Sequence, residues 1–447
     1  MGNDTVAIIG AGAAGIAAAI DIAPHKTVVL AEARPYIGGR ARSFVDRETG
    51  EVIDNGQHIL MGCYESFLAS IRKLDTEHLF RRQQYLRVEF AEPDGFRDVL
   101  DCSKVSGAIG VAAGIFGLRR LDFISKIKAL LFAAALRAGI LRTEKLTSAE
   151  FLRKYGQSEE IIRRLWEPIV LATLNTKPEM ASAKLFIEVL RRAFFGKSDA
   201  SQILIAEKGL SEIFAPVGKY LENRGGRLLL STAAEELIFT DGKVSAVRFA
   251  NGETIQCDAV ISAVPPRSLE RLLPAEIRGR KPFDVLSAIR FSPIISLYLW
   301  FDRPVMSNDF VAMLGTASQW TFNRRAICAA PPEIISKYPG HIAITVSAGN
   351  ELAEQYPEKT ALHCADEIRR AFPEAAAAKL LAWQVVKEKS ATFLATPEAE
   401  QYRLCTETPI KNLMLAGDWT ATGLPATLEG AAQSGIKASA AIKKILL

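Results

Sequence analysis

The chain has 447 residues, 49% of them hydrophobic, and a formal net charge of +5. This length allows two domains with sizeable cores, and the small basic excess does not indicate nucleic-acid binding. Six scattered cysteines without a C-x-x-C pair argue against a disulfide framework, and five histidines without ligand spacing predict no metal site. No apolar run reaches about eighteen residues, so we expect no transmembrane helix. The first predicted strand begins near Met1, so we expect no signal peptide and a cytoplasmic location.

The first forty residues carry a dinucleotide-binding pattern. A β-branched strand leads into a G-x-G-x-x-G turn, a helix of small residues, a second strand and an acid. These features are Thr5–Ile9, Gly10 with Gly12 and Gly15, Ala13–Ala23, Thr27–Leu30 and Glu32. The turn and the helix N-terminus, with Ala13 and Ala14, are expected to bind a pyrophosphate. Glu32 and Ala33 are expected at a ribose, where the acid disfavours a 2′-phosphate.

A second glycine segment follows, with Gly38 and Gly39 next to Arg40, Ala41 and Arg42. Paired glycines let the chain pass close to a ligand, and the two arginines supply fixed positive charge. An NAD domain does not need this second phosphate clamp, so the segment indicates FAD. The arrangement resembles the flavin amine oxidase and phytoene desaturase superfamily, in which a GGR segment follows the first ribose acid.

The polar segment Asp54-Asn55-Gly56-Gln57-His58 then lies between apolar residues. Gly56 favours a close approach of the backbone to a ligand. We therefore expect Asn55, Gly56, Gln57 and His58 to line the cofactor site.

Helical and hairpin patterns then interrupt the nucleotide fold. We expect a hairpin around Glu92-Pro93-Asp94-Gly95, a helical lobe at about 105–195, a helix at 209–223 and long strands at 289–301, 341–348 and 380–387. The predicted class is α/β: a Rossmann-like FAD-binding domain of the glutathione-reductase type with an inserted α+β substrate domain. The FAD-binding domain is predicted at 1–62, 200–270 and 410–447, and the substrate domain at 63–199 and 271–409.

Residues 105–142 are apolar and studded with lysine and arginine. Such a stretch suits peripheral contact with the anionic inner face of the cell membrane. An amphipathic core helix with a solvated basic face explains the same pattern.

Near the C-terminus, a strand at 413–416 ends in Gly417-Asp418, and Ala426-Thr427 opens a long helix. Asp418 can bond a ribityl or ribose hydroxyl, and the helix N-terminus favours negative charge on a reduced flavin. The superfamily resemblance also implies that Ala234 and Ala263 lie near the adenine end of FAD.

Five motifs sharpen the resemblance. DNGQHIL at Asp54, LWEPIVLATLNT at Leu165, LYLWFDRPV at Leu297, KEKSATF at Lys387 and AGDWTATGLPATLEGA at Ala416 resemble the squalene-associated flavoprotein family, whose activity is hydroxysqualene dehydroxylase. This implies noncovalent FAD, a long apolar isoprenoid substrate, and hydride transfer from reduced flavin N5 to an allylic carbon of hydroxysqualene, giving squalene in hopanoid biosynthesis. No second G-x-G-x-x-G is present, so we expect an external electron donor.

Loss of a hydroxyl needs a proton donor or a polarising group. The candidates within these motifs are Asp54, Gln57, His58, Glu167, Lys387 and Lys389, with His58 first because its ordinary pKa lies nearest neutrality. Three other functions stay open: carotenoid-type desaturation, amine oxidation and flavin-free prenyl binding. Amine oxidation is disfavoured because Ser296 stands where those enzymes usually carry a lysine.

Overall fold

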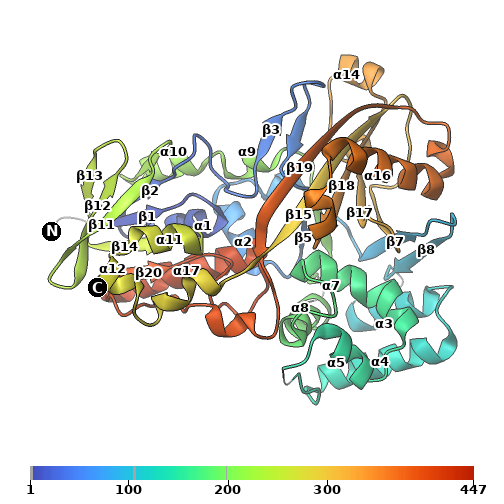
Figure 1. Cartoon of the computed structure of the whole chain (residues 1–447), viewed down its shortest axis with the longest axis horizontal. Helices are drawn as coiled ribbons and strands as arrows, with labels where there is room; N and C mark the ends of the chain where they lie inside the picture. The colour runs from blue at the N-terminus through green and yellow to red at the C-terminus, as the bar shows by residue number, and fades with distance from the viewer. Residues whose placement is uncertain (1–3, 104–106, 144, 198, 447) are drawn as a thin grey trace.

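The structure is a computed structural model that describes residues 4–103, 107–143, 145–197 and 199–446. Figure 1 shows a sheet with flanking helices at one end of the molecule, a larger sheet at the other, and a helical lobe beside the larger sheet. The predicted class, α/β with a Rossmann-like nucleotide unit and an inserted α+β region, is confirmed.

The nucleotide unit is a five-stranded parallel sheet whose strand order is β10-β2-β1-β14-β20. Strands β1, β2, β14 and β20 are nearly continuous runs of buried residues, as expected when helices cover both faces of a parallel sheet, whereas the edge strand β10 is more exposed. Their bounds are Thr5–Ile9 for β1, Thr27–Ala31 for β2, Arg227–Leu229 for β10, Ala259–Ser262 for β14 and Leu413–Leu415 for β20. The first and last segments of the chain therefore share one sheet. Helices α1 (Ala13–Ile22) and α17 (Leu428–Ile445) pack directly against each other.

The larger sheet has seven strands in the order β19-β15-β18-β17-β16-β7-β8. One face carries Ile295, Leu297 and Leu299, which share an apolar cluster with residues of α15 (Asn350–Glu354) and α16 (Pro357–Ala371). The opposite face carries Ser296, Tyr298 and Trp300. The strand bounds are Arg87–Ala91 (β7), Arg97–Asp101 (β8), Phe291–Phe301 (β15), Phe310–Met313 (β16), Trp320–Asn323 (β17), Gly340–Ser347 (β18) and Leu380–Phe393 (β19).

The helical lobe contains α3 (Gly107–Gly117), α4 (Phe123–Arg137), α5 (Ser148–Lys154), α6 (Glu159–Ile161), α7 (Glu167–Leu174) and α8 (Ala183–Phe195). Between α6 and α7 the backbone forms a π-helical turn over Ile162–Trp166. Pro168 lies two residues after this turn and lacks an N–H group, so the wider turn keeps the chain helical where a regular hydrogen bond is impossible. The helical structure is also interrupted between α3 and α4, where Asp122 caps α4 by accepting from Ser125 N.

The helix expected at 209–223 is two helices, α9 (Leu210–Phe214) and α10 (Val217–Glu222). Pro216 causes the break, because its ring cannot occupy a helix interior. The sheet β5-β9-β6 joins Ile59–Met61, Ile203–Ala206 and Phe80–Arg82. It crosses the predicted boundary at residue 62, so the division into two domains stays a prediction.

The remaining elements connect these layers. Their bounds are Ser43–Val45 (β3), Val52–Asp54 (β4), Glu65–Lys73 (α2), Ala234–Thr240 (β11), Lys243–Phe249 (β12), Thr254–Gln256 (β13), Pro266–Leu272 (α11), Ala275–Arg278 (α12), Arg324–Ile327 (α13) and Pro332–Lys337 (α14).

Gly435 tests the contact between α1 and α17. A Cβ at Gly435 would lie 2.1 Å from Ala14 O, whereas a Cβ at the helical Gly218 of α10 would lie at ordinary contact distance, 3.4 Å from Leu228. We expect Gly435→Ala to lower the free energy of unfolding by about 1–3 kcal/mol, because the two helices must separate. Gly218→Ala should be neutral or stabilising, because alanine favours a helix. Urea melts of both variants measure this, and equal effects would contradict the packing described.

Candidate active site

The glycine turn after β1 closes tightly on itself. Gly10 has a φ of +101°, and a Cβ at Gly15 would lie 1.9 Å from Gly10 O and 3.2 Å from the Ala263 side chain. A side chain at Gly15 would therefore force β1 and α1 apart. Ala263 N also donates to Ile9 O at 2.8 Å, so Ala263 lies beside the turn.

Gly12 has different surroundings. A Cβ added there would meet no atom within 4 Å, although Gly12 forms an isolated bridge with Gly38, and a Cβ at Gly39 would lie 3.3 Å from Gly12 Cα. Gly12 is the N-cap of α1, with no side-chain capping bond and no acidic residue in the first turn. The two glycine segments and the uncapped helix, which begins at Ala13 and Ala14, thus leave N–H groups for an anionic ligand. These residues fit a dinucleotide pyrophosphate.

Glu32 ends the second strand with its carboxylate fixed by backbone donors. Ala11 N donates to Oε2 at 2.8 Å and Arg34 N to Oε1 at 3.0 Å, so Glu32 and its neighbour Ala33 lie directly beside the glycine turn. Thr232 N donates to Glu32 O at 2.8 Å. The chain that leads into Ala234 therefore also lies beside Glu32. The predicted ribose and adenine residues therefore lie together.

Arg40 joins the first and last motifs. Its Nη2 donates to Asp418 Oδ1 at 2.7 Å and its Nη1 donates to Ala391 O. The next residue, Ala41, is buried, and the Arg42 guanidinium lies over the Tyr36 ring, 4.6 Å from its centre. A ligand hydroxyl at Asp418 would share that carboxylate with Arg40.

The final motif places a helix N-terminus beside this pair. Gly417 N donates to Ser434 Oγ at 2.7 Å, and Thr427 caps α17 by accepting from Gly430 N at 3.1 Å. Ala426 precedes the cap and is partly buried. The N-terminus of α17, which is the positive end of its dipole, therefore lies within the motif that contains Asp418.

Asp54 is fully buried and holds its segment in place. Its Oδ1 accepts from Ser43 Oγ at 2.7 Å and from Leu210 N at 3.0 Å, and its Oδ2 pairs with Arg324 Nη1 at 3.3 Å. Tyr298 accepts from Asp54 N and donates to Asp54 O through its hydroxyl, at 3.1 and 2.8 Å. The segment is thus tied to β15 and α9 together.

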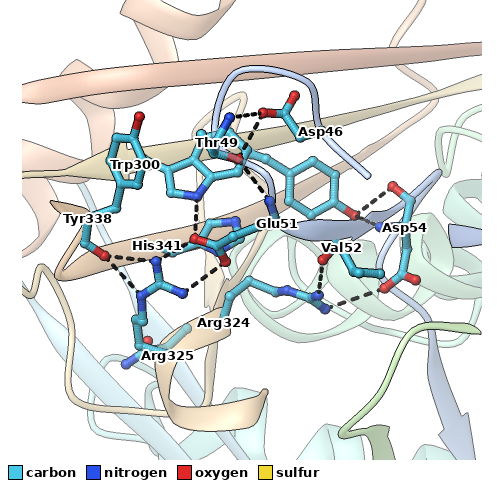
Figure 2. A network of polar contacts seen from close by, with 12 residues as sticks. Asp46, Thr49, Glu51, Val52, Asp54, Trp300, Arg324, Arg325, Tyr338 and His341 are labelled. Atoms are coloured by element: carbon cyan, nitrogen blue, oxygen red, sulfur yellow. Dashed lines mark hydrogen bonds and ion pairs between the residues drawn. The ribbon is translucent and has the colours of Figure 1, made fainter. Parts of the chain in front are cut away.

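Arg324, which we did not predict, is the main partner of this segment (Figure 2). It is buried, and it donates to Gln57 Oε1 at 2.9 Å and to Val52 O at 3.1 Å as well as pairing with Asp54. Asn55 N donates to Arg42 O at 2.9 Å, which links the segment to the second glycine motif. Asn55, Gly56, Gln57 and His58 are therefore held next to the GGR segment.

A second buried cluster surrounds Glu51 (Figure 2). Its carboxylate accepts from both Arg325 Nη atoms, at 2.9 and 2.5 Å, from Trp300 Nε1 at 2.9 Å and lies 2.9 Å from His341 Nδ1. Burial opposes ionisation, but the bonds from His341 and Arg325 hold the pKa of Glu51 well below its usual range. Burial lowers the pKa of His341 to about 4, outweighing the bond to Glu51. Glu51 is therefore ionised and His341 neutral at pH 7.

His58 is half-buried and lies with Nδ1 2.8 Å from Gly56 O. Burial lowers the pKa of His58, outweighing the effect of the carbonyl of Gly56, which raises it. A neutral ring facing a carbonyl must carry its proton on Nδ1, so Nε2 is an acceptor. This geometry favours a role in bracing the loop over the predicted role as proton donor.

The other candidate acids lie elsewhere. Lys387 is opposite Ile295 on the α16 face of the sheet, and its Nζ donates to Ala353 O at 3.0 Å. Lys389 is exposed and lies 3.4 Å from Glu354. Glu167 begins α7, where burial and Glu179 raise its pKa. The structure does not bring these three residues to the Asp54–His58 segment.

The last four family motifs contain the buried aromatic residues Trp166, Trp300, Phe393 and Trp419. Trp166 Nε1 donates to Gln157 at 3.0 Å within the helical lobe, Trp300 Nε1 to Glu51, and Trp419 Nε1 to Val264 O at 3.1 Å. Phe393 packs under the Arg403 guanidinium, 4.4 Å from the ring centre. Their polar atoms are satisfied within the protein.

The model of the family described as "Flavin containing amine oxidoreductase" matches residues 13–443. A hydroxysqualene dehydroxylase from Sinorhizobium fredii is 31% identical and covers 97% of both chains, and a probable zeta-carotene desaturase from Synechococcus elongatus is 26% identical over 98% of both. Among solved structures, an oxidoreductase from Methanosarcina mazei superposes with a TM-score of 0.74 at 16% identity, covering 97% of this chain and 99% of its own. The solved structure supports the fold alone.

Gly12→Ala tests the pyrophosphate cradle. Because the added methyl group meets no protein atom, the apoprotein should keep its stability, while bound FAD should be lost at least about tenfold more readily, because the methyl group fills the space a phosphate needs. Thermal melts of apoprotein and the ratio of flavin to protein absorbance measure the two effects. Unchanged FAD affinity would place the pyrophosphate elsewhere.

His341→Gln tests the buried Glu51 cluster through pH. With a folded pKa of about 4 and an ordinary value of 6.5, His341 takes up a proton more readily in the unfolded chain, so its contribution to stability is present above pH 6.5 and is lost as pH falls toward 4. Glutamine keeps a donor for Glu51 but does not titrate. The wild type should therefore lose roughly 1–2 kcal/mol more than the variant between pH 7 and pH 5 in urea melts. Identical pH dependence would contradict a neutral His341.

Proposed function

This chain belongs to the family of flavin-containing amine oxidoreductases, and from that premise we propose that it reductively removes the hydroxyl group of hydroxysqualene to give squalene, in squalene and hopanoid biosynthesis. FAD is its cofactor. The observation that carries the substrate is the match to a hydroxysqualene dehydroxylase, which is 31% identical over 97% of each chain. Carotenoid-type desaturation is the alternative, supported by a desaturase at 26% identity.

The residues described above fit FAD held without a covalent bond. The pyrophosphate would lie on Gly12 and the N-terminus of α1, with Glu32 at the ribose, and Asp418 with the N-terminus of α17 at the flavin end. Bound FAD, once reduced, supplies a hydride. Cys405 is the only cysteine near the final motif, and we assign it no role in flavin attachment.

The protein's own contribution is to exclude water from an ionising allylic C–O bond and to fix the reacting carbon. The sheet face that carries Ser296 and Tyr298 is buried and turned toward the Asp54–His58 segment. We propose that the isoprenoid lies between this face and the nucleotide unit, and that the two predicted domains meet there. Arg324 holds Gln57 and Asp54 in place, while neutral His58 braces Gly56.

The decisive assay is anaerobic. Protein loaded with FAD and reduced with dithionite should be reoxidised by hydroxysqualene and should form squalene in equal amount. In the same assay His58→Gln should retain most of its turnover and all of its FAD, as its bracing role predicts. If hydroxysqualene leaves the flavin reduced while a polyene hydrocarbon reduces the oxidised protein, the desaturase replaces this proposal.

The reductant is expected to be external, as the single G-x-G-x-x-G indicates. We also propose that the protein docks on the membrane in which its substrate dissolves. Within the described ranges, no helix is long and apolar enough to cross a bilayer.

Helix α4 carries the evidence for docking. Its buried face contains Ala129, Phe132 and Leu136, yet its outer face is also apolar, with Phe123, Ile124 and Leu131 exposed by 69%, 66% and 64%. An ordinary core helix has a polar outer face. Lys128 and Arg137 are exposed on the same helix and suit anionic lipid, whereas Arg120 is committed to Glu92 and Asp94.

A flotation assay with vesicles of anionic phospholipid tests the docking face. The triple variant Phe123→Ser, Ile124→Ser, Leu131→Ser should lose at least about tenfold in binding, because buried apolar area drives interfacial association. Tyr356→Ser is the matched control, since Tyr356 is 83% exposed on another surface. Absence of wild-type binding at low salt would remove the proposal.

A further inference from the structure

Three polar side chains form a row on the buried sheet face. Ser296 on β15 is paired directly with Thr345 on β18, and Thr345 is paired directly with Trp320 on β17. Directly paired residues point to the same face, with their Cβ atoms about 4.5–5.5 Å apart. We call Ser296, Thr345 and Trp320 the polar row.

The polar row has no partner within the protein. Ser296 Oγ, Thr345 Oγ1 and Trp320 Nε1 are all shielded from solvent, and none has a hydrogen-bond partner among the described residues. Ser296 is 1% exposed. Burying three such groups without partners costs free energy, so a polar ligand group bound there would be strongly favoured.

The row faces the candidate active site. A Cβ at Gly56 would lie 3.1 Å from Ser296 Oγ, so the Asp54–His58 segment passes directly over one end of the row. Tyr298, the next residue of β15 on this face, bonds the backbone of Asp54. The row also has apolar neighbours: Ala343 is buried on the same face, and the ring centre of Phe310 lies 6.2 Å from that of Trp320.

We infer that the polar row binds the hydroxyl group of an otherwise apolar isoprenoid alcohol and so determines which substrate is accepted. This inference rests on the proposed dehydroxylase function and adds the residues that recognise the substrate. Serine and threonine can donate and accept, and the indole N–H can only donate, so together they satisfy one hydroxyl. A site built to bond a hydroxyl discriminates against the analogue that lacks it, which here is the product, squalene. A desaturase acting on a hydrocarbon would leave the row unsatisfied.

The test uses oxidised, FAD-loaded protein, because oxidised flavin cannot reduce the substrate and only binding is then measured. Hydroxysqualene and squalene are titrated in detergent micelles, and binding is followed by the change in flavin absorbance. The wild type should bind the alcohol more tightly. The Ser296→Ala, Thr345→Val double variant should lose about tenfold in affinity for hydroxysqualene while its affinity for squalene stays unchanged. Trp320→Phe should act in the same direction.

Thr321→Val is the matched control. Thr321 is next to Trp320 in β17 but pairs with Ile344 on the opposite, α16 face, where its hydroxyl bonds Ser318 O at 3.3 Å. The control should keep the wild-type preference. FAD content and melting temperature, with the single variants Ser296→Ala and Thr345→Val, show whether each protein folds.

Two results would overturn the inference while leaving the proposed function intact. In one, the wild type makes squalene anaerobically but the double variant keeps its preference for the alcohol. In the other, the double variant weakens both ligands equally or changes the flavin spectrum before ligand is added, which would assign the row to scaffold or cofactor. If the wild type makes no squalene at all, the proposed function fails and the inference with it.

Discussion

The buried pair between Asp54 and Arg324 is the interaction on which the candidate site depends. Asp54 comes from the chain between the nucleotide motifs, and Arg324 is the first residue of α13, directly after strand β17 of the large sheet, so the pair ties one to the other. Both side chains are buried. Removing one partner from such a pair leaves an uncompensated charge in the interior and costs about 3–5 kcal/mol. The pair is therefore a strong constraint on how the two parts of the molecule meet.

The neighbouring bonds extend this constraint. Arg324 also fixes Gln57, the Tyr298 hydroxyl fixes the Asp54 backbone, and Glu51 anchors the preceding residues through Arg325, Trp300 and His341. The segment over the sheet face is thus held in position by side chains of the protein itself. Such preorganisation suits chemistry in which water must be kept from a reactive carbon.

The sequence was sufficient for the parts of the fold that depend on local spacing. The glycine turn, Glu32, the long strands and the C-terminal helix follow from patterns a few residues long. Pro216 also carried a local signal, that of a helix breaker, inside the single helix expected at 209–223. Contacts between distant residues were not predictable, because no local pattern reports them: Arg324 meets partners 270 and 267 positions away.

The motifs located the candidate acids in the sequence but not in space. Lys387 belongs to a distinctive motif, yet in β19 its side chain lies on the α16 face of the sheet. The pairing of β19 with β15 shifts register between Ser292 and Ile294. Alternation along the sequence therefore does not predict on which face Lys387 lies. Ser296 was noticed only as the replacement of a lysine. Its place in a row with Thr345 and Trp320 depends on the strand order of the large sheet. The alternation of residues along one strand does not predict that order.

A crystal structure of the FAD-loaded protein would test the central claim most directly, namely that the Asp54–His58 segment, held by Arg324 and Tyr298, lies beside both the cofactor and the substrate. We expect the flavin ring to lie against Gly56, the bonds of Arg324 to Asp54 and Gln57 to persist, and the Ser296 side chain to lie beside the bound substrate. A flavin ring bound away from Gly56, or a segment rearranged so that Arg324 releases Asp54, would contradict it.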